Sequence, residues 1–110
     1  MTIRVTTTVA KTISAFLQDP DEPQYGMSLM EQTGLASGTL YPILMRLQKE
    51  GWLDVSVEQI DPAVEGRPRR KNYLLTQTGR IAAREALAEL YEVARVSARS
   101  TGRAKPATQP

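Results

Sequence analysis

Residues 37–47 read Ser-Gly-Thr-Leu-Tyr-Pro-Ile-Leu-Met-Arg-Leu and contain a regular apolar pattern. Four apolar residues in it recur at i, i+3, i+4 and i+7: Leu40, Ile43, Leu44 and Leu47. That spacing is typical of an α-helix with one face in a hydrophobic core. Ser37 or Thr39 can cap the start of the helix, and Gly51 marks its end. The pattern predicts a helix whose remaining faces are free to meet a partner.

Two shorter helices are predicted before this one. The first follows three threonines that can supply a cap, and its apolar face consists of Val9, Ile13, Phe16 and Leu17. Residues 19–23 end it, because two prolines and three carboxylates cannot continue an apolar stripe. The second helix is predicted from about Gln24 to Thr33, with Gly34 as its C-cap. Its expected inward-facing side chains are Tyr25, Leu29 and Met30.

After residue 51 the period of the apolar residues changes from helical to alternating. Leu53, Val55 and Val57 fall on one side of a predicted strand, and residues 70–75 can return as a second strand. The Asp-Pro and Glu-Gly-Arg-Pro sequences between them are breakers. The pattern therefore predicts a β-hairpin with a long tip.

A helical pattern resumes at Thr76 and continues to about Ser100. Its apolar stripe consists of Ala83, Leu87, Leu90 and Ala94. Three short helices and a hairpin already form the small core, so few elements of the same chain remain to cover this stripe. We therefore expect a dimer interface here. Residues 101–110 have no apolar periodicity and are expected to form a disordered basic tail.

Positive charge is concentrated in the second part of the chain. Residues 1–66 hold four basic and nine acidic side chains, whereas residues 67–110 hold ten basic and three acidic ones. Within five consecutive residues, four are cationic: Arg67, Arg69, Arg70 and Lys71. Such a density indicates contact with a polyanion, although a solvated loop is the plainer alternative.

Three helices followed by a two-stranded hairpin are the arrangement of a winged helix-turn-helix domain. We expect a mainly α fold with a small β-hairpin: a DNA-binding domain at 1–75, a dimerisation helix at 76–100 and the tail. In such domains the third helix enters the major groove of DNA, and the hairpin, called the wing, touches the neighbouring backbone or minor groove. The candidate DNA-binding residues are Ser37, Thr39, Tyr41 and Arg46 on the third helix and Arg67, Arg69, Arg70 and Lys71 in the wing. Packing of its ring is the alternative role for Tyr41.

Several stretches resemble the PadR family of bacterial transcriptional regulators. They are Tyr25-Gly26-Met27, residues 33–47, Glu50-Gly51-Trp52-Leu53 and residues 66–80. The Gly-Thr-Leu-Tyr-Pro sequence of the third helix and the Gly-Arg-Pro-Arg-Arg sequence of the wing are specific in combination. The resemblance, to the short branch of the family, implies a homodimeric repressor on an inverted-repeat operator, with the last helix helping to form the dimer. Many members of the family release DNA when a small molecule binds.

The composition argues against enzyme chemistry. The chain has no cysteine and no histidine, so thiolate catalysis, imidazole bases and metal sites built on these residues are absent. No catalytic residue, metal or cofactor is therefore expected, and a nuclease ranks low because no acidic residues group on one predicted element. A winged-helix module that binds an acidic protein surface stays open as an alternative. With no apolar run of membrane-spanning length and no signal pattern, a cytoplasmic protein is expected.

Overall fold

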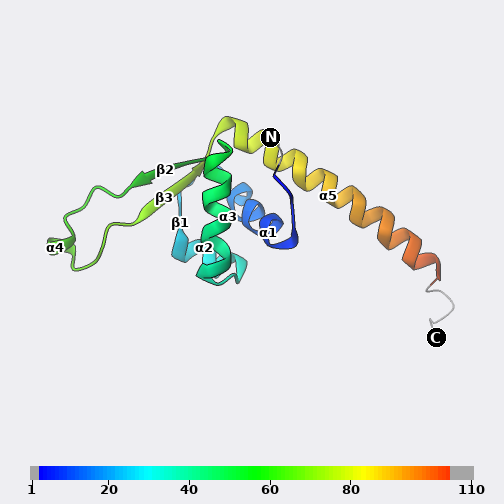
Figure 1. Cartoon of the computed structure of the whole chain (residues 1–110), viewed down its shortest axis with the longest axis horizontal. Helices are drawn as coiled ribbons and strands as arrows, with labels where there is room; N and C mark the ends of the chain where they lie inside the picture. The colour runs from blue at the N-terminus through cyan, green and yellow to red at the C-terminus, as the bar shows by residue number, and fades with distance from the viewer. Residues whose placement is uncertain (1–2, 105–110) are drawn as a thin grey trace.

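Five helices and three strands follow one another along residues 3–104, the part of the chain that the computed structural model describes, with side chains described up to residue 98 (Figure 1). The elements are α1 (Thr7–Gln18), β1 (Gln24–Tyr25), α2 (Gly26–Thr33), α3 (Ser37–Lys49), β2 (Leu53–Val57), α4 (Pro62–Glu65), β3 (Lys71–Leu75) and α5 (Gln77–Ala104). This mostly helical order with a small antiparallel sheet confirms the predicted winged helix-turn-helix fold.

The sheet has the strand order β1-β3-β2. Strands β2 and β3 pair along their full length and form the predicted hairpin. The short strand β1 pairs on the other side of β3, with Gln24 opposite Tyr73 and Tyr25 opposite Asn72. The prediction that residues 24–25 belong to the second helix is therefore wrong, because they extend the sheet and α2 begins at Gly26. Strand β1 thus ties the start of α2 to the wing.

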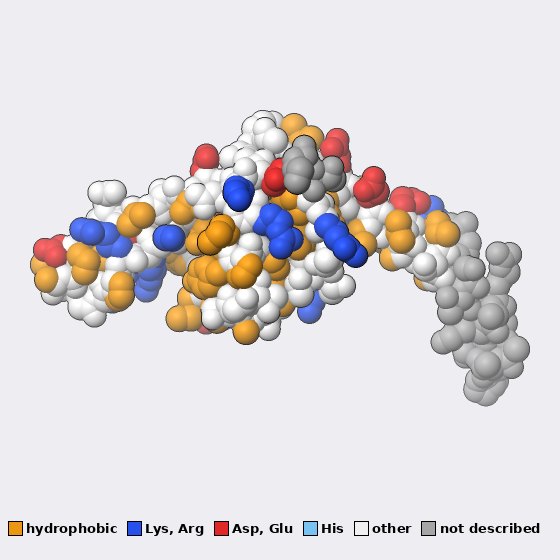
Figure 2. All heavy atoms as spheres, in the orientation of Figure 1, with side chains coloured by type: hydrophobic (Ala, Val, Ile, Leu, Met, Phe, Trp, Pro, Cys, Tyr) orange, Lys and Arg blue, Asp and Glu red, His pale blue; other side chains and the backbone are white. Residues whose placement is uncertain are grey.

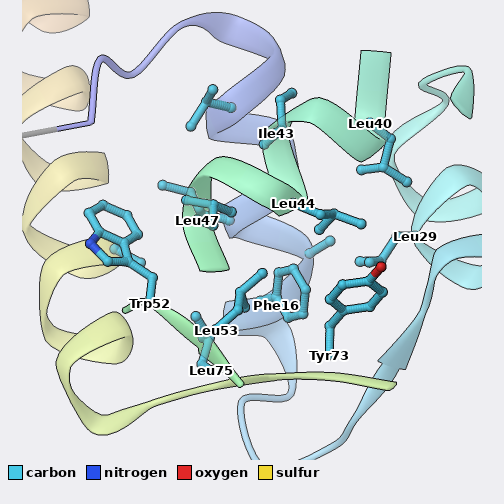
Figure 3. Packing of buried hydrophobic residues seen from close by; sticks show 14 of the residues in the cluster. Phe16, Leu29, Leu40, Ile43, Leu44, Leu47, Trp52, Leu53, Tyr73 and Leu75 are labelled. Atoms are coloured by element: carbon cyan, nitrogen blue, oxygen red, sulfur yellow. The ribbon is translucent and has the colours of Figure 1, made fainter. Parts of the chain in front are cut away.

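The hydrophobic core lies between the sheet and helices α1, α2 and α3 (Figure 3). The predicted apolar stripe of α3 is buried: Leu40, Ile43, Leu44 and Leu47. Phe16 of α1 and Leu29 of α2 complete the centre, and Trp52 packs at the junction between α3 and β2. Helix α1 also buries one polar side chain, Thr12, whose hydroxyl donates a hydrogen bond of 2.9 Å to the Thr8 carbonyl.

Helix α5 begins beside the sheet, packs against α1 and then extends away from the rest of the chain (Figure 1). At its start, the hydroxyl of Thr76 donates to the Gly51 carbonyl and accepts a bond from the Gly79 amide. The helix continues through Ala104, so the disordered tail predicted from residue 101 begins too early. The remainder of that predicted tail, residues 105–110, lies outside the described residues.

Two local predictions need correction. Neither Ser37 nor Thr39 caps α3, because the N-cap residue is Ala36 and no side chain bonds to the helix end. The breakers between the two wing strands instead enclose the short helix α4, with Asp61 accepting a bond from the Ala63 amide and Gly66 in the left-handed conformation after its last turn. Residues that interrupt a strand are also the residues that cap a helix. The wing tip is therefore helical.

In the part of the chain that the structure describes, each helix is too short or too polar to cross a lipid bilayer.

Candidate nucleic-acid interface

Helix α3 presents a polar surface on the side opposite its buried stripe. The four predicted DNA-binding residues of this helix are all exposed: Ser37, Thr39, Tyr41 and Arg46. The first three lie within the first five residues of the helix, whereas Arg46 lies in its last turn. Hydroxyls and backbone amides at a helix start suit phosphates and base edges, so this surface has the chemistry of a recognition helix.

The side chain of Tyr41 extends from α3 to the start of α2. Its ring packs over Gly26, where a side-chain carbon would overlap the phenol oxygen. Even so, the residue keeps 42% of its surface exposed. The ring therefore packs against α2 as the alternative role expects, with its hydroxyl end against Gly26 and the rest of the exposed surface facing solvent.

In the wing, Arg67 is held by an acidic partner. Its two terminal nitrogens donate to the two carboxylate oxygens of Glu58 at 2.7 and 3.0 Å. The backbone amide of Arg70 adds a third bond to the same carboxylate at 3.1 Å. Chiefly because of the bond from Arg67, the pKa of Glu58 falls from 4.5 to about 2. Arg67 thus links the segment before β3 to the segment after β2 through its ion pair with Glu58.

The other three wing cations are placed differently. Nε of Arg69 donates to the Ile60 carbonyl at 3.0 Å, which leaves its terminal nitrogens for other partners. The guanidinium carbon of Arg70 lies 5.1 Å from the centre of the Tyr25 ring, which is the geometry of a cation–π contact. Lys71, the first residue of β3, is exposed. These three side chains keep hydrogen-bond donors for a phosphate.

A cleft of about 560 Å³ separates the wing from the start of α2 and the exposed side of α3. Its lining residues are Tyr25, Gly26, Met27, Tyr41, Tyr73 and residues 67–71. Figure 2 shows basic side chains gathered along the wing, with acidic ones at its tip. Tyr41 of α3 and the predicted wing cations therefore line one cleft, in which basic and aromatic side chains lie together.

The cleft does not include every predicted residue. Ser37, Thr39 and Arg46 lie elsewhere on α3, outside its lining. Sequence reasoning missed Tyr25 and Gly26, which line the cleft from the β1–α2 junction. Their nearest signal in the sequence is the Tyr-Gly-Met stretch, which carries part of the family resemblance and falls within the second predicted helix. Among the described residues, no group of three or more acidic side chains could hold a metal ion.

The apolar stripe of α5 differs from the prediction at its first residue. Ala83 is fully buried in the core of its own chain, so it has no surface to offer a partner. Leu87 and Leu90 are partly buried, and Ala94 is exposed. Farther along, three large apolar side chains are exposed: Tyr91, Val93 and Val96. A second cleft, of about 470 Å³, lies between Leu90 and α1.

Comparison with known proteins adds independent evidence. Residues 16–85 match the model of the transcriptional regulator PadR-like family. The chain is similar to the solved structure of a PadR-like transcription factor from Bacteroides fragilis, with a TM-score of 0.65, 23% identity, and 84% of this chain and 91% of that chain covered. A PadR family regulator from Eggerthella lenta gives a TM-score of 0.70 at 22% identity, over 86% of this chain and 85% of that one. At this identity the structures show a shared fold.

A third solved structure, of the PcaV transcriptional regulator from Streptomyces coelicolor in complex with its natural ligand, has a TM-score of 0.65 and 23% identity, over 88% of this chain and 62% of that one. No curated protein sequence is similar enough to match. The family model covers more than half of the chain and includes α3, the wing and the start of α5. The chain therefore belongs to the PadR-like family of transcriptional regulators, which bind DNA through a winged helix-turn-helix domain.

Proposed function

We propose that this regulator is a homodimeric repressor that binds an inverted-repeat operator. Each protomer places α3 in the major groove of one half-site and its wing on the adjacent backbone. The bases are read from α3, whose DNA-binding residues are Ser37, Thr39, Tyr41 and Arg46. Arg69, Arg70 and Lys71 bind phosphates, and Arg67 supports them through its bond with Glu58.

The observation that carries this proposal is the cleft between α3 and the wing. Tyr41 from one element and Arg69, Arg70 and Lys71 from the other line the same cleft, although about thirty residues separate them in sequence. A solvated loop that only kept the protein soluble would have no need of this arrangement. A basic rim beside the exposed start of a helix is, in contrast, what a DNA duplex requires.

Dimerisation through α5 is supported by the apolar side chains on the part of the helix that extends beyond the core. Tyr91, Val93 and Val96 are more than half exposed in the single chain. Exposed apolar groups at such density mark an interaction surface. A second copy would cover Tyr91 and Val93 together with Leu87, Leu90 and Ala94, whereas Val96 lies on the opposite side of the helix from Ala94. Ala83 takes no part, because its own chain already buries it.

Release of the operator by a small-molecule effector is the part of the proposal that rests on family resemblance alone. PcaV was solved with its natural ligand, which shows that a protein of this fold can hold one.

The proposal is tested by selecting bound fragments from a random pool of duplex DNA and measuring their binding in excess competitor. We expect an inverted repeat whose half-sites are about 10 base pairs apart, or a multiple of that distance. A protein-interaction module would give no sequence-selective complex. That result would contradict the proposed function.

The dimer has a separate test by sedimentation of the full chain. Ala94→Glu introduces a charge on the face that Ala83 occupies three helical turns earlier, whereas the matched control Ala88→Glu places the charge on another side of α5. Both positions are exposed in the single chain, so neither change disturbs its core. We expect Ala94→Glu to give monomers and Ala88→Glu to leave the dimer intact. Equal behaviour of the two variants would move the interface elsewhere.

A further inference from the structure

Tyr25 is a large aromatic residue whose ring is not part of the hydrophobic core. It is the second residue of β1, paired with β3 opposite Asn72, and 36% of its surface is exposed. The core already contains Phe16 and Tyr73 and does not use the Tyr25 ring. The ring lies instead in the lining of the cleft beneath the wing.

This ring supports the guanidinium of Arg70. The distance of 5.1 Å between the guanidinium carbon and the ring centre fits a cation–π contact. The backbone of Arg70 is fixed as well, since its amide donates to the Glu58 carboxylate at 3.1 Å. Among the described residues the ion pairs are those of Arg67, Arg80 and Arg95, so the Arg70 guanidinium is held in place without being neutralised.

The residue after Tyr25 fixes a second side chain of the same cleft. Gly26 has no side chain, and the phenol of Tyr41 occupies the space that one would fill. Two consecutive residues therefore hold one group from the wing and one from α3. A guanidinium and a phenol at one cleft offer charge-assisted and neutral donors to the same anionic oxygen.

We propose that Tyr25 is a positioning residue, which holds Arg70 beside Tyr41 so that both bind one phosphodiester of the DNA backbone. This inference rests on the proposed DNA binding and assigns a structural cause to one of its contacts. A protein that grips one phosphate from both the wing and α3 fixes the angle at which α3 enters the groove. Tyr25 would thereby affect DNA binding without touching a base.

The test uses the full chain and an operator selected from random DNA. Each backbone phosphate is replaced in turn by an uncharged methylphosphonate, and affinity is measured for the wild type, Arg70→Ala, Tyr25→Leu and Tyr25→Phe. For the wild type we expect one phosphate per half-site whose neutralisation weakens binding roughly tenfold or more. That position should lose most of its effect in Arg70→Ala, where only the Tyr41 hydroxyl still contacts the phosphate, and a smaller part in Tyr25→Leu. An exposed arginine on α5, changed as Arg84→Ala, is the matched control and should keep the wild-type profile.

The phenylalanine variant separates positioning from direct contact. Tyr25→Phe keeps the aromatic face and should bind like the wild type, whereas Tyr25→Leu should lose about two- to fivefold in affinity per half-site. Thermal unfolding of both variants shows whether the fold is unchanged. If Tyr25→Phe loses as much affinity as Tyr25→Leu, the hydroxyl itself contacts DNA and the inference is wrong.

Two further outcomes would overturn the inference. An unchanged phosphate profile in Tyr25→Leu would show that Arg70 needs no support from the ring. The wild type could instead bind DNA selectively but show no phosphate whose effect depends on Arg70. This result would mean that Arg70 does not contact the DNA backbone, and it would leave selective DNA binding intact. Absence of any selective complex would reject the proposed function itself.

Discussion

The phenol of Tyr41, on α3, fills the space that a side chain at Gly26 would need. This contact fixes the distance between α3 and the start of α2 at the edge of the cleft. It also makes the glycine a requirement of the interface, because a larger residue must displace the ring.

We predict that Gly26→Ala weakens operator binding by moving Tyr41. Gly26→Ala in a Tyr41→Ala background should then cost little additional affinity, because the displaced group is already gone. Operator affinities of the wild type, the two single variants and the double variant are measured by fluorescence anisotropy. Together they form a double-mutant cycle. Additive losses would show that Gly26 acts on DNA binding independently of Tyr41.

The four wing cations should differ in their effect on the salt dependence of binding. Arg69→Ala or Arg70→Ala removes one phosphate contact per protomer and should lower the magnitude of the log–log salt slope by about 1.8 for a dimer. Arg67→Ala should leave the slope nearly unchanged, because Arg67 is paired with Glu58. Titrations at several salt concentrations measure the slopes. A drop of equal size for Arg67→Ala would place this arginine on the DNA.

Glu58 should make the stability of the protein depend on acidity. Its pKa is lowered to about 2 in the folded chain, chiefly by the bond from Arg67, and lies near 4.5 without that partner. A lowered pKa means that the carboxylate stabilises the fold fully above about pH 4.5 and progressively less as the pH falls toward 2. We expect the difference in melting temperature between the wild type and Glu58→Gln to be constant at neutral pH and to shrink between pH 4.5 and 2. A difference that does not change with pH would remove this role from Glu58.

The start of α5 depends on a close approach between two backbones. A side-chain carbon at Gly79 would overlap the carbonyl of Trp52, which cannot move away as a flexible side chain could. Gly79→Ala should therefore lower the free energy of unfolding by about 1 to 3 kcal/mol. The matched control is Gly38→Ala in α3, where the space is empty and alanine should stabilise the helix by roughly 0.5 to 1 kcal/mol. Urea unfolding measures both, and equal changes of the same sign would contradict the packing at Gly79.

Periodicity and local charge predicted much of this architecture. The stripe from Leu40 to Leu47 and the alternation of β2 depend on contacts with a single core, and such contacts leave a regular pattern in the sequence. The cationic run at 67–71 needs no folding to be recognised. These features placed α3 and the wing correctly.

The remaining features depend on contacts between distant segments. Arg67 meets Glu58 only because α4 turns the wing tip, and α4 was missed because Pro62 and Gly66 are read equally well as strand breakers. A strand of two residues leaves no period, so the place of Tyr25 could not be predicted. The burial of Ala83 likewise follows from the packing of α5 against α1.

Base reading by α3 is the central claim, and Thr39→Ala tests it most directly. Thr39 is exposed in the first turn of α3, and the helix cap does not use its side chain. The change therefore removes a hydroxyl and a methyl from the surface without altering the core or the cap. Affinity for the selected operator and for random DNA is measured on the same variant, with thermal unfolding as the control. We predict a loss of roughly 1 to 3 kcal/mol on the operator, almost no change on random DNA and an unchanged melting temperature. Equal losses on the two DNAs, or no loss on the operator, would contradict base reading at this position.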